Sequence, residues 1–244
     1  MPEITLTSYQ NDPSILESQL SRFKSADGLE FYTYSHYLDL DRVWERYFDH
    51  LKDTFDFAIQ PGDVVIDVGA HHGIVALNSA RLGAKVFALE PYPINLDVLK
   101  RNVALYPQYD ITIKAQAAFS KSGPAVFNAG KTSTTGALID VGRDWKRTQE
   151  NYEVQCINFE DLFRTYGLKN VKLLKLDCEG GEYDFLLNVS REQFRQVEFY
   201  YVETHQTKFY QSAVLEKFIK DQGYKIRFFQ EPNGCVELVC LRDG

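Results

Sequence analysis

The stretch that decides the fold runs from Asp63 to Leu96 and reads DVVIDVGAHHGIVALNSARLGAKVFALEPYPINL. Its first apolar run, residues 64–66, is β-branched and predicts a strand that is buried on both faces. A glycine turn at 67–73 then opens a helical pattern, and a second apolar run at 86–89 predicts the next strand. Glu90 stands at the end of that strand. This order predicts the start of a nucleotide-binding βαβ unit, in which a carboxylate about 20 residues after the turn binds ribose hydroxyls.

The residues of the turn indicate which ligand is bound. A dinucleotide site needs the spacing G-x-G-x-x-G, but here the glycines are Gly69 and Gly73, and His71 would crowd a diphosphate. Asp67 precedes the turn, and a carboxylate attracts an ammonium group and repels a phosphate. S-adenosylmethionine (SAM) carries an ammonium, a sulfonium and a ribose, and no phosphate. Asp67 together with Glu90 therefore favours SAM over NAD.

Four motifs, in this order and spacing, resemble the FkbM-type family of SAM-dependent methyltransferases. They are VIDVGAHHG, ALEPYPIN, LLKLDCEGGEYDFL at 173–186 and YYVETH at 200–205, and they cover roughly Pro61 to His205. The first two motifs are shared by most class I methyltransferases, whereas the D-x-E-G-x-E element at 177–182 is more specific to this family. The chain departs from the family pattern at one position, because His71 stands where the family usually has Asn.

The resemblance implies an α/β fold of the Rossmann-like class I methyltransferase type. Such a fold has a seven-stranded, mostly parallel sheet with a reversed last strand, and helices on both faces. The chain itself agrees, because the stretch 111–117 and apolar runs at 171–176 and 198–202 predict further strands. Asn158 is predicted to cap a short helix at 159–166. Asn233-Gly234 between the runs 225–229 and 235–241 predicts a hairpin, so the last strand is expected to be antiparallel.

The 244 residues, 44% of them hydrophobic, are enough for one such domain with an added N-terminal segment. We assign residues 1–56 to an N-terminal helical cap segment, with helices expected at 12–24 and 39–55. Residues 57–244 are assigned to the SAM-dependent methyltransferase domain. An irregular insertion at about 119–170 lies on the ligand side of the predicted sheet, where it either selects the substrate or is a plain surface hairpin.

Ligands of open α/β sheets bind beyond the carboxyl ends of the strands, so the strand-end residues form the predicted site. Glu90 is expected to bind both ribose hydroxyls, and Asp67 the methionine ammonium, directly or through water. Tyr92 is expected either to pack on adenine or to be a surface tyrosine, while Ala118 and Phe119 border adenine. The predicted SAM-binding residues are Asp67, Gly69, Ala70, His71, Gly73, Glu90, Pro91, Tyr92, Ala118, Phe119 and Asp177.

Methyl transfer to a hydroxyl group needs alignment and the removal of a proton. The candidate bases are Asp177, Glu179, Glu203 and His205, and His205 matches neutral pH best by its reference pKa. We predict Asp177, Glu179 and His205 as the catalytic residues. A Mg²⁺ bound by Asp177 and Glu203 is an alternative, but the paired-Asp spacing of metal-dependent catechol-type enzymes is absent, so no metal is predicted.

The resemblance implies O-methylation of a hydroxyl group on a small molecule, secondary metabolite or sugar. The net charge of −7 disfavours nucleic acid and anionic membranes as partners, and the N-P-P-[YF] motif of amino-methylating nucleic-acid enzymes is absent after the fourth strand. Three alternatives stay open: a methyltransferase acting on protein or nucleic acid, a non-catalytic SAM-binding module, and an NAD dehydrogenase.

A cytoplasmic location is expected from three features of the chain. No apolar run approaches 18 residues, and the N-terminus has neither the basic nor the apolar region of a signal peptide. The four cysteines contain no C-x-x-C pair, so reduced thiols are expected.

Overall fold

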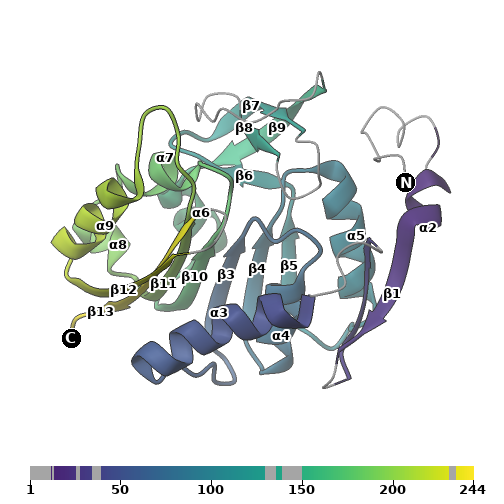
Figure 1. Cartoon of the computed structure of the whole chain (residues 1–244), viewed down its shortest axis with the longest axis horizontal. Coiled ribbons are helices and arrows are strands. Elements are labelled where there is room, and N and C mark those ends of the chain that lie inside the picture. The colour runs from purple at the N-terminus through teal and green to yellow at the C-terminus, as the bar shows by residue number, and fades with distance from the viewer. Residues whose placement is uncertain are drawn as a thin grey trace.

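A seven-stranded sheet forms the centre of the computed structural model, which describes residues 12, 14–25, 28–34, 40–129, 136–138, 150–230 and 235–244 (Figure 1). In chain order its strands are β3 (Val64–Val68), β4 (Lys85–Leu89), β5 (Ile111–Lys114), β10 (Val171–Leu176), β11 (Val197–Thr204), β12 (Tyr224–Gln230) and β13 (Val236–Arg242). Their order across the sheet is β12-β13-β11-β10-β3-β4-β5.

The direction of the strands confirms the predicted sheet. Strands β3, β4, β5, β10 and β11 pair in parallel, whereas β13 is antiparallel to both β11 and β12. The predicted strand runs at both ends of the Asn-Gly turn are therefore confirmed, while the turn itself, residues 231–234, lies outside the described residues.

Helices cover both faces of the sheet. On one face lie α3 (Leu40–Phe55), α4 (Ile74–Arg81) and α5 (Pro93–Ala104), and on the other lie α6 (Phe159–Tyr166), α7 (Glu182–Leu186), α8 (Arg191–Phe194) and α9 (Ser212–Asp221). Successive side chains of a strand point to opposite faces of the sheet. Val65 therefore packs toward α3 and α4, while Ile66 packs toward α6 and α7. This is the buried, two-sided pattern that the apolar runs predicted.

The N-terminal segment contains a hairpin that the sequence patterns did not predict. Helix α2 (Ser14–Gln19) ends where strand β1 (Leu20–Lys24) begins, and β1 pairs antiparallel with β2 (Glu30–Tyr34). The helix expected at 12–24 is therefore wrong after Gln19. Pairing with β2 and the burial of Phe31 against Leu29 and Leu77 override the local helical pattern.

The insertion is more regular than predicted. Strands β6 (Gln116–Ala118), β7 (Gly123–Asn128), β8 (Ala137–Leu138) and β9 (Asn151–Ile157) form a second sheet in the order β6-β9-β7-β8. The single strand predicted at 111–117 is wrong, because β5 ends at Lys114 and β6 joins the second sheet. The predicted cap is confirmed: the Asn158 side chain accepts a hydrogen bond from the Asp161 amide at 2.8 Å.

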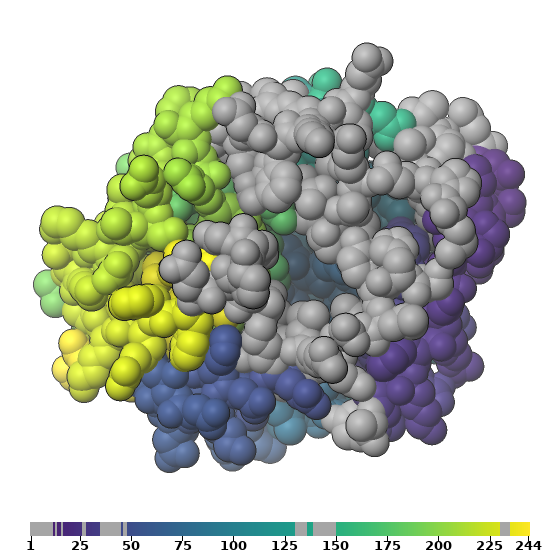
Figure 2. All heavy atoms as spheres, viewed as in Figure 1, coloured from purple at the N-terminus to yellow at the C-terminus, as the bar shows by residue number. Residues whose placement is uncertain are grey.

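Figure 2 shows the same view with all atoms, in which the N-terminal hairpin (purple) and α3 (blue) occupy separate parts of the visible face. The yellow C-terminal strands border α3, which contacts β13. Within the described part of the chain, no helix combines the length and the apolar character that a membrane span requires.

One buried side chain joins the hairpin to the main sheet. Asn102 on α5 is fully buried, accepts a hydrogen bond from the Tyr32 amide, and donates to the carbonyl oxygens of Tyr32 at 2.9 Å and His72 at 2.8 Å. Asn102 thereby ties β2 to the glycine turn that follows β3.

We expect Asn102→Ala to lower the free energy of unfolding by about 2–3 kcal/mol, because it leaves buried backbone groups without partners. Urea unfolding measures this, and Lys100→Ala, at an exposed position of the same helix, is the matched control with a change below about 0.5 kcal/mol. Equal stabilities of the two variants would contradict the assigned role of Asn102.

Candidate active site

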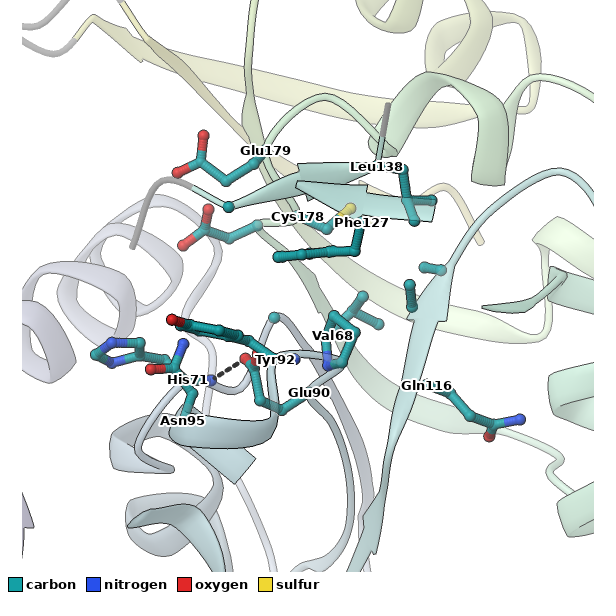
Figure 3. A pocket seen from close by; sticks show the side chains of 16 residues that line it. Val68, His71, Glu90, Tyr92, Asn95, Gln116, Phe127, Leu138, Cys178 and Glu179 are labelled. Carbon is teal, nitrogen blue, oxygen red and sulfur yellow. Dashed lines mark hydrogen bonds between the residues drawn. The ribbon is translucent and has the colours of Figure 1, made fainter. Parts of the chain in front are cut away.

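A pocket lies beyond the carboxyl ends of β3, β4 and β10, where ligands of open α/β sheets are expected (Figure 3). The predicted site residues that line it are Gly69, His71, Glu90, Pro91, Tyr92, Ala118, Asp177 and Glu179. The predicted residues that do not line it are Asp67, Ala70, Gly73, Phe119 and His205. The structure thus brings together residues that are more than 100 positions apart in the chain.

Glu90 is held rigidly at the floor of the pocket. Its Oε2 accepts a hydrogen bond from the His71 amide at 2.8 Å, drawn in Figure 3, and its Oε1 accepts one from the Tyr92 amide at 2.9 Å. Burial raises the pKa of Glu90 to about 7, although these hydrogen bonds oppose the shift. A carboxylate has about four acceptor positions, of which the two amides and the Asn95 side chain use a part, and the remainder is available to a ligand.

The glycine turn is shaped by close contacts between backbone segments. Gly69 has φ 73°, and a Cβ added there would lie 1.8 Å from the Asp177 carbonyl oxygen. Only glycine fits at position 69, because the backbone at the end of β10 leaves no room for a Cβ. This constraint holds whether or not a ligand also approaches the turn. At Gly73 the reason is different, since φ is 89° and a Cβ would lie 2.5 Å from the Leu99 side chain, which packs α5 against the start of α4.

Aromatic side chains form an apolar wall of the pocket. Tyr92 is 6% exposed, so the interpretation of Tyr92 as a surface tyrosine is wrong. Its ring centroid lies 6.1 Å from that of Phe127 and 5.7 Å from that of Tyr152, with interplanar angles of 18° and 21°. Figure 3 shows Phe127 and Leu138 across the pocket from Glu90 and Val68. The insertion, which was expected on the ligand side of the sheet, therefore supplies part of the wall, although the sequence patterns did not identify Phe127 or Leu138 as lining residues.

Asp67 does not face the pocket. It is fully buried, and its Oδ1 lies 3.4 Å from Nζ of Lys175, which is also 3.5 Å from Oδ2 of Asp177. Direct contact of Asp67 with a ligand ammonium is therefore wrong, because the carboxylate faces an ammonium group of the protein itself. A contact through water stays a prediction.

Lys175 was not among the predicted site residues. Burial opposes its charge, but the carboxylates of Asp177 and Asp67 outweigh this effect and hold the pKa of Lys175 above its ordinary value. The sequence does contain a signal, since a lysine inside the apolar run LLKLD stands in a strand that is buried on both faces. Such a lysine needs a carboxylate partner.

His205 lies behind the pocket wall and is 2% exposed. Its Nδ1 is 3.0 Å from Oε1 of Glu182, and its Nε2 is 3.6 Å from Oε1 of Glu203. Burial would lower the pKa of His205, but the carboxylates of Glu182 and Asp177 and a hydrogen bond with Cys235 outweigh it and raise the pKa to about 10. The assignment of His205 as the general base stays a prediction, although the ring lies behind the pocket wall and both of its nitrogens face carboxylates.

The spacing of the element at 177–182 has a structural cause in Glu182. This carboxylate is fully buried and accepts hydrogen bonds from the amides of Cys178 at 2.8 Å and Gly180 at 2.9 Å. It therefore closes the turn that begins with Asp177 and places Glu179, whose φ is 59°, at the wall of the pocket.

Comparisons with known proteins agree with this geometry. Residues 67–226 match the model of the methyltransferase FkbM domain. The chain is 27% identical over 246 aligned positions to the methyltransferase sdnD of Sordaria araneosa, covering 88% of this chain and 90% of that protein. The chain is also 44% identical over 48 residues to a ribosomal protein L11 methyltransferase of Carboxydothermus hydrogenoformans, and this match covers 19% of this chain and 16% of that protein.

The fold is also found among solved structures. A SAM-dependent methyltransferase from Agrobacterium tumefaciens superposes with a TM-score of 0.51 at 11% identity, covering 92% of this chain and 70% of that one. The architecture is thus the class I methyltransferase fold, as predicted. An NAD dehydrogenase is not supported by any of these matches.

We expect Gly69→Ala to destabilise the protein by more than about 3 kcal/mol, since the added methyl group meets a backbone carbonyl rather than a movable side chain. Gly62→Ala is the matched control: φ is 91°, nothing lies within 4 Å of the added Cβ, and only the strain of about 1–2 kcal/mol remains. Thermal unfolding compares the two variants. A loss at Gly69 no larger than that at Gly62 would show that the contact with Asp177 is not a constraint.

Proposed function

Because the chain belongs to the FkbM methyltransferase family, we propose that it transfers a methyl group from SAM to a hydroxyl group of a small molecule or sugar. The observation that carries the proposal is the pocket itself. One side presents the Glu90 carboxylate beside an aromatic wall, and another presents the carboxylates of Asp177 and Glu179.

The residues of the pocket fit the parts of SAM. Glu90 accepts hydrogen bonds from two backbone amides and interacts with the Asn95 side chain, and the remaining acceptor capacity of the carboxylate suits the ribose hydroxyls. The rings of Tyr92 and Phe127 offer an apolar surface of the kind on which adenine packs. When bound, SAM supplies a methyl group on a sulfonium, and transfer forms the oxygen–carbon bond while the carbon–sulfur electron pair goes to sulfur.

The acceptor is proposed to lie on the side of Asp177 and Glu179. Carboxylates accept a hydrogen bond from a hydroxyl group and so orient its oxygen lone pair, which is the alignment that an in-line displacement requires. Lys175 and His205 behind this wall keep the carboxylates in place. The acidic net charge of −7 further supports a small, uncharged acceptor over nucleic acid.

Incubation with methyl-labelled SAM and fractionated metabolite extracts tests the proposal. We expect the label to appear on oxygen in a small-molecule product, identified by mass spectrometry and NMR. Label found only in protein or nucleic acid would support the alternative methyltransferase classes. Tight SAM binding with no labelled product from any extract would support a non-catalytic SAM-binding module.

Glu90→Ala is expected to weaken SAM binding by about two to four decades. Two hydrogen bonds to a charged group are worth about 1.5–3 kcal/mol each, and their loss has this effect on the dissociation constant. Calorimetry measures it, and Glu153→Ala, at an exposed carboxylate of β9, is the control with unchanged affinity.

The pH dependence gives a second readout for Glu90. Ribose hydroxyls donate to the ionised carboxylate, which in the free protein forms only above a pKa of about 7. Affinity should therefore be flat above this pH and fall as the pH drops below it. The ligand 5′-methylthioadenosine, which has the ribose but no amino group, isolates this effect, and a wild-type affinity that does not change with pH would contradict it.

Asp177→Asn is expected to lower turnover by about 10² or more while SAM affinity changes by only a few-fold. The substitution keeps the shape of the side chain but removes the charge that orients the acceptor. Asp221→Asn, at an exposed position of α9, serves as the control. A wild-type rate in Asp177→Asn would move the assignment to Glu179.

A further inference from the structure

At the wall of the pocket, the ends of β10 and β11 surround one imidazole nitrogen with carboxylates. Nε2 of His205 lies 3.8 Å from Oδ1 of Asp177 and 3.8 Å from Oε2 of Glu179. One donor atom from each of these three residues lies within 4.8 Å of the others. The separations are too long for hydrogen bonds and lie between the distances of about 3 Å and about 4.2 Å that separate neighbouring and opposite ligands of one octahedral ion.

The second observation concerns the other nitrogen of the same ring. Nδ1 of His205 is 3.0 Å from Oε1 of Glu182, which is fully buried and held by two backbone amides. In metal sites a histidine ligand usually donates its remaining N–H to a carboxylate, which fixes the tautomer and the direction of the ring. Glu182 fixes His205 in this way and directs Nε2 toward Asp177 and Glu179.

The charge of the group also favours a cation. Four carboxylates, those of Asp177, Glu179, Glu182 and Glu203, lie within 4 Å of the His205 ring nitrogens. Lys175 is 3.5 Å from Asp177, but it also neutralises Asp67 on its other side. Charges that are removed from water need compensation, and a divalent ion at this point would supply it.

We propose that Asp177, Glu179 and His205 bind a divalent cation of the Mn²⁺ or Mg²⁺ type, and that an oxygen of the acceptor completes its coordination. Two oxygens and one nitrogen suit such ions. Asp177 and Glu179 line the pocket, so the open side of the ion faces the space where the acceptor is proposed to bind. This step rests on the proposed function.

Such an ion would also activate the acceptor. A hydroxyl group bound to a divalent cation loses its proton more easily, and the proton would pass to solvent while oxygen keeps the electron pair for attack on the methyl group. His205 would then act as a neutral ligand through Nε2, with its Nδ1 proton donated to Glu182. The acceptor class becomes an alcohol whose oxygen can approach a metal ion, alone or with a neighbouring hydroxyl.

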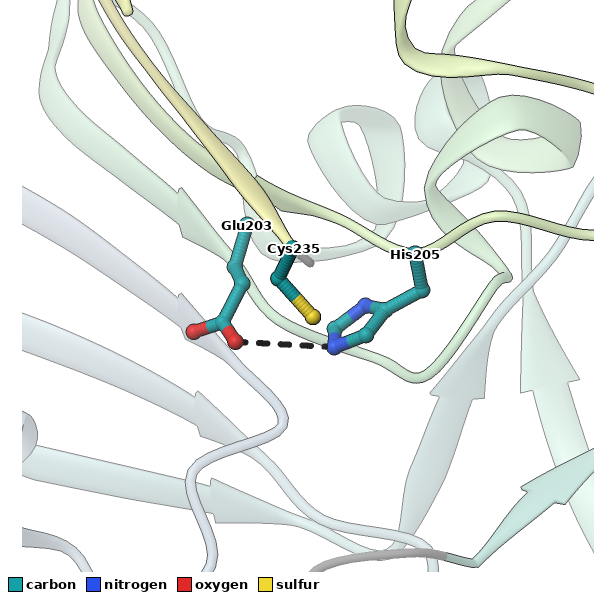
Figure 4. A group of neighbouring side chains, drawn as sticks. All are labelled: Glu203, His205 and Cys235. Carbon is teal, nitrogen blue, oxygen red and sulfur yellow. Dashed lines mark ion pairs between the residues drawn. The ribbon is translucent and has the colours of Figure 1, made fainter. Parts of the chain in front are cut away.

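A different set of ligands surrounds the same nitrogen on another side. Figure 4 shows Cys235 and Glu203 directed at the His205 ring, and their ligand atoms also lie within 4.8 Å of one another. A thiolate in this set would favour Zn²⁺. We favour the set of Asp177 and Glu179 because both residues line the pocket, whereas Glu203 and Cys235 do not.

The test uses the full chain after treatment with a chelator, and Mn²⁺ alone as the probe, without SAM. Calorimetry and electron paramagnetic resonance of free Mn²⁺ should show one site per chain. Asp177→Asn and Glu179→Gln should each weaken Mn²⁺ binding at least tenfold, and Glu182→Gln should weaken it about 10–100-fold by releasing the ring. Cys235→Ser, the matched control, should leave Mn²⁺ affinity unchanged within about threefold, and thermal unfolding verifies that each variant is folded.

No Mn²⁺ binding at millimolar concentration would overturn the proposal, as would binding that persists unchanged in both Asp177→Asn and Glu179→Gln. Zn²⁺ binding that is lost in Cys235→Ser, without Mn²⁺ binding, would overturn it in favour of the second set. SAM binding in the presence of chelator separates this proposal from the proposed function. If SAM binds there and Mn²⁺ does not bind the metal-free protein, only the metal site fails.

Discussion

The buried ammonium group of Lys175 connects the two strands on which the site is built. Lys175 lies opposite Asp67 in the parallel register of β10 and β3, and its Nζ donates to the Gly69 carbonyl oxygen at 3.0 Å. An ammonium taken out of water costs several kcal/mol unless it is paired and hydrogen-bonded, so it draws Asp67, Asp177 and the glycine turn together. The position of Asp177 at the pocket wall is a consequence of this charge in the sheet.

The parts of the fold that the sequence predicted are those set by local patterns. The strands β3 and β4, the turn between them and Glu90 follow from β-branched runs and glycine positions within about 30 residues. The patterns failed where pairing between strands determines the secondary structure. This is the case at β1 and at the break between β5 and β6. The patterns also did not reveal the partner of His205, since a reference pKa contains no information on Glu182, which is 23 positions away in the chain.

The one departure from the family pattern has a physical explanation. His71 has φ 50°, in the left-handed region, where Asn and His are enriched among residues other than glycine. Its contribution to the Glu90 side chain comes from the backbone amide, and its ring stacks on His72 at 3.7 Å. The position therefore requires a residue that tolerates this conformation, and Asn and His both meet the requirement.

The two halves of the pocket are built in different ways, and this difference explains what a sequence can reveal about such a protein. The side with Glu90 comes from one continuous βαβ unit, so a short motif identifies it. The opposite side combines the turn at 177–182 and the insertion strands β7 and β8, which meet only in the folded chain. Because Phe127 and Leu138 come from this insertion, changes there can alter this wall of the pocket while Glu90 and its βαβ unit are preserved. A short motif therefore identifies one side of the pocket, whereas the other side is encoded by tertiary contacts.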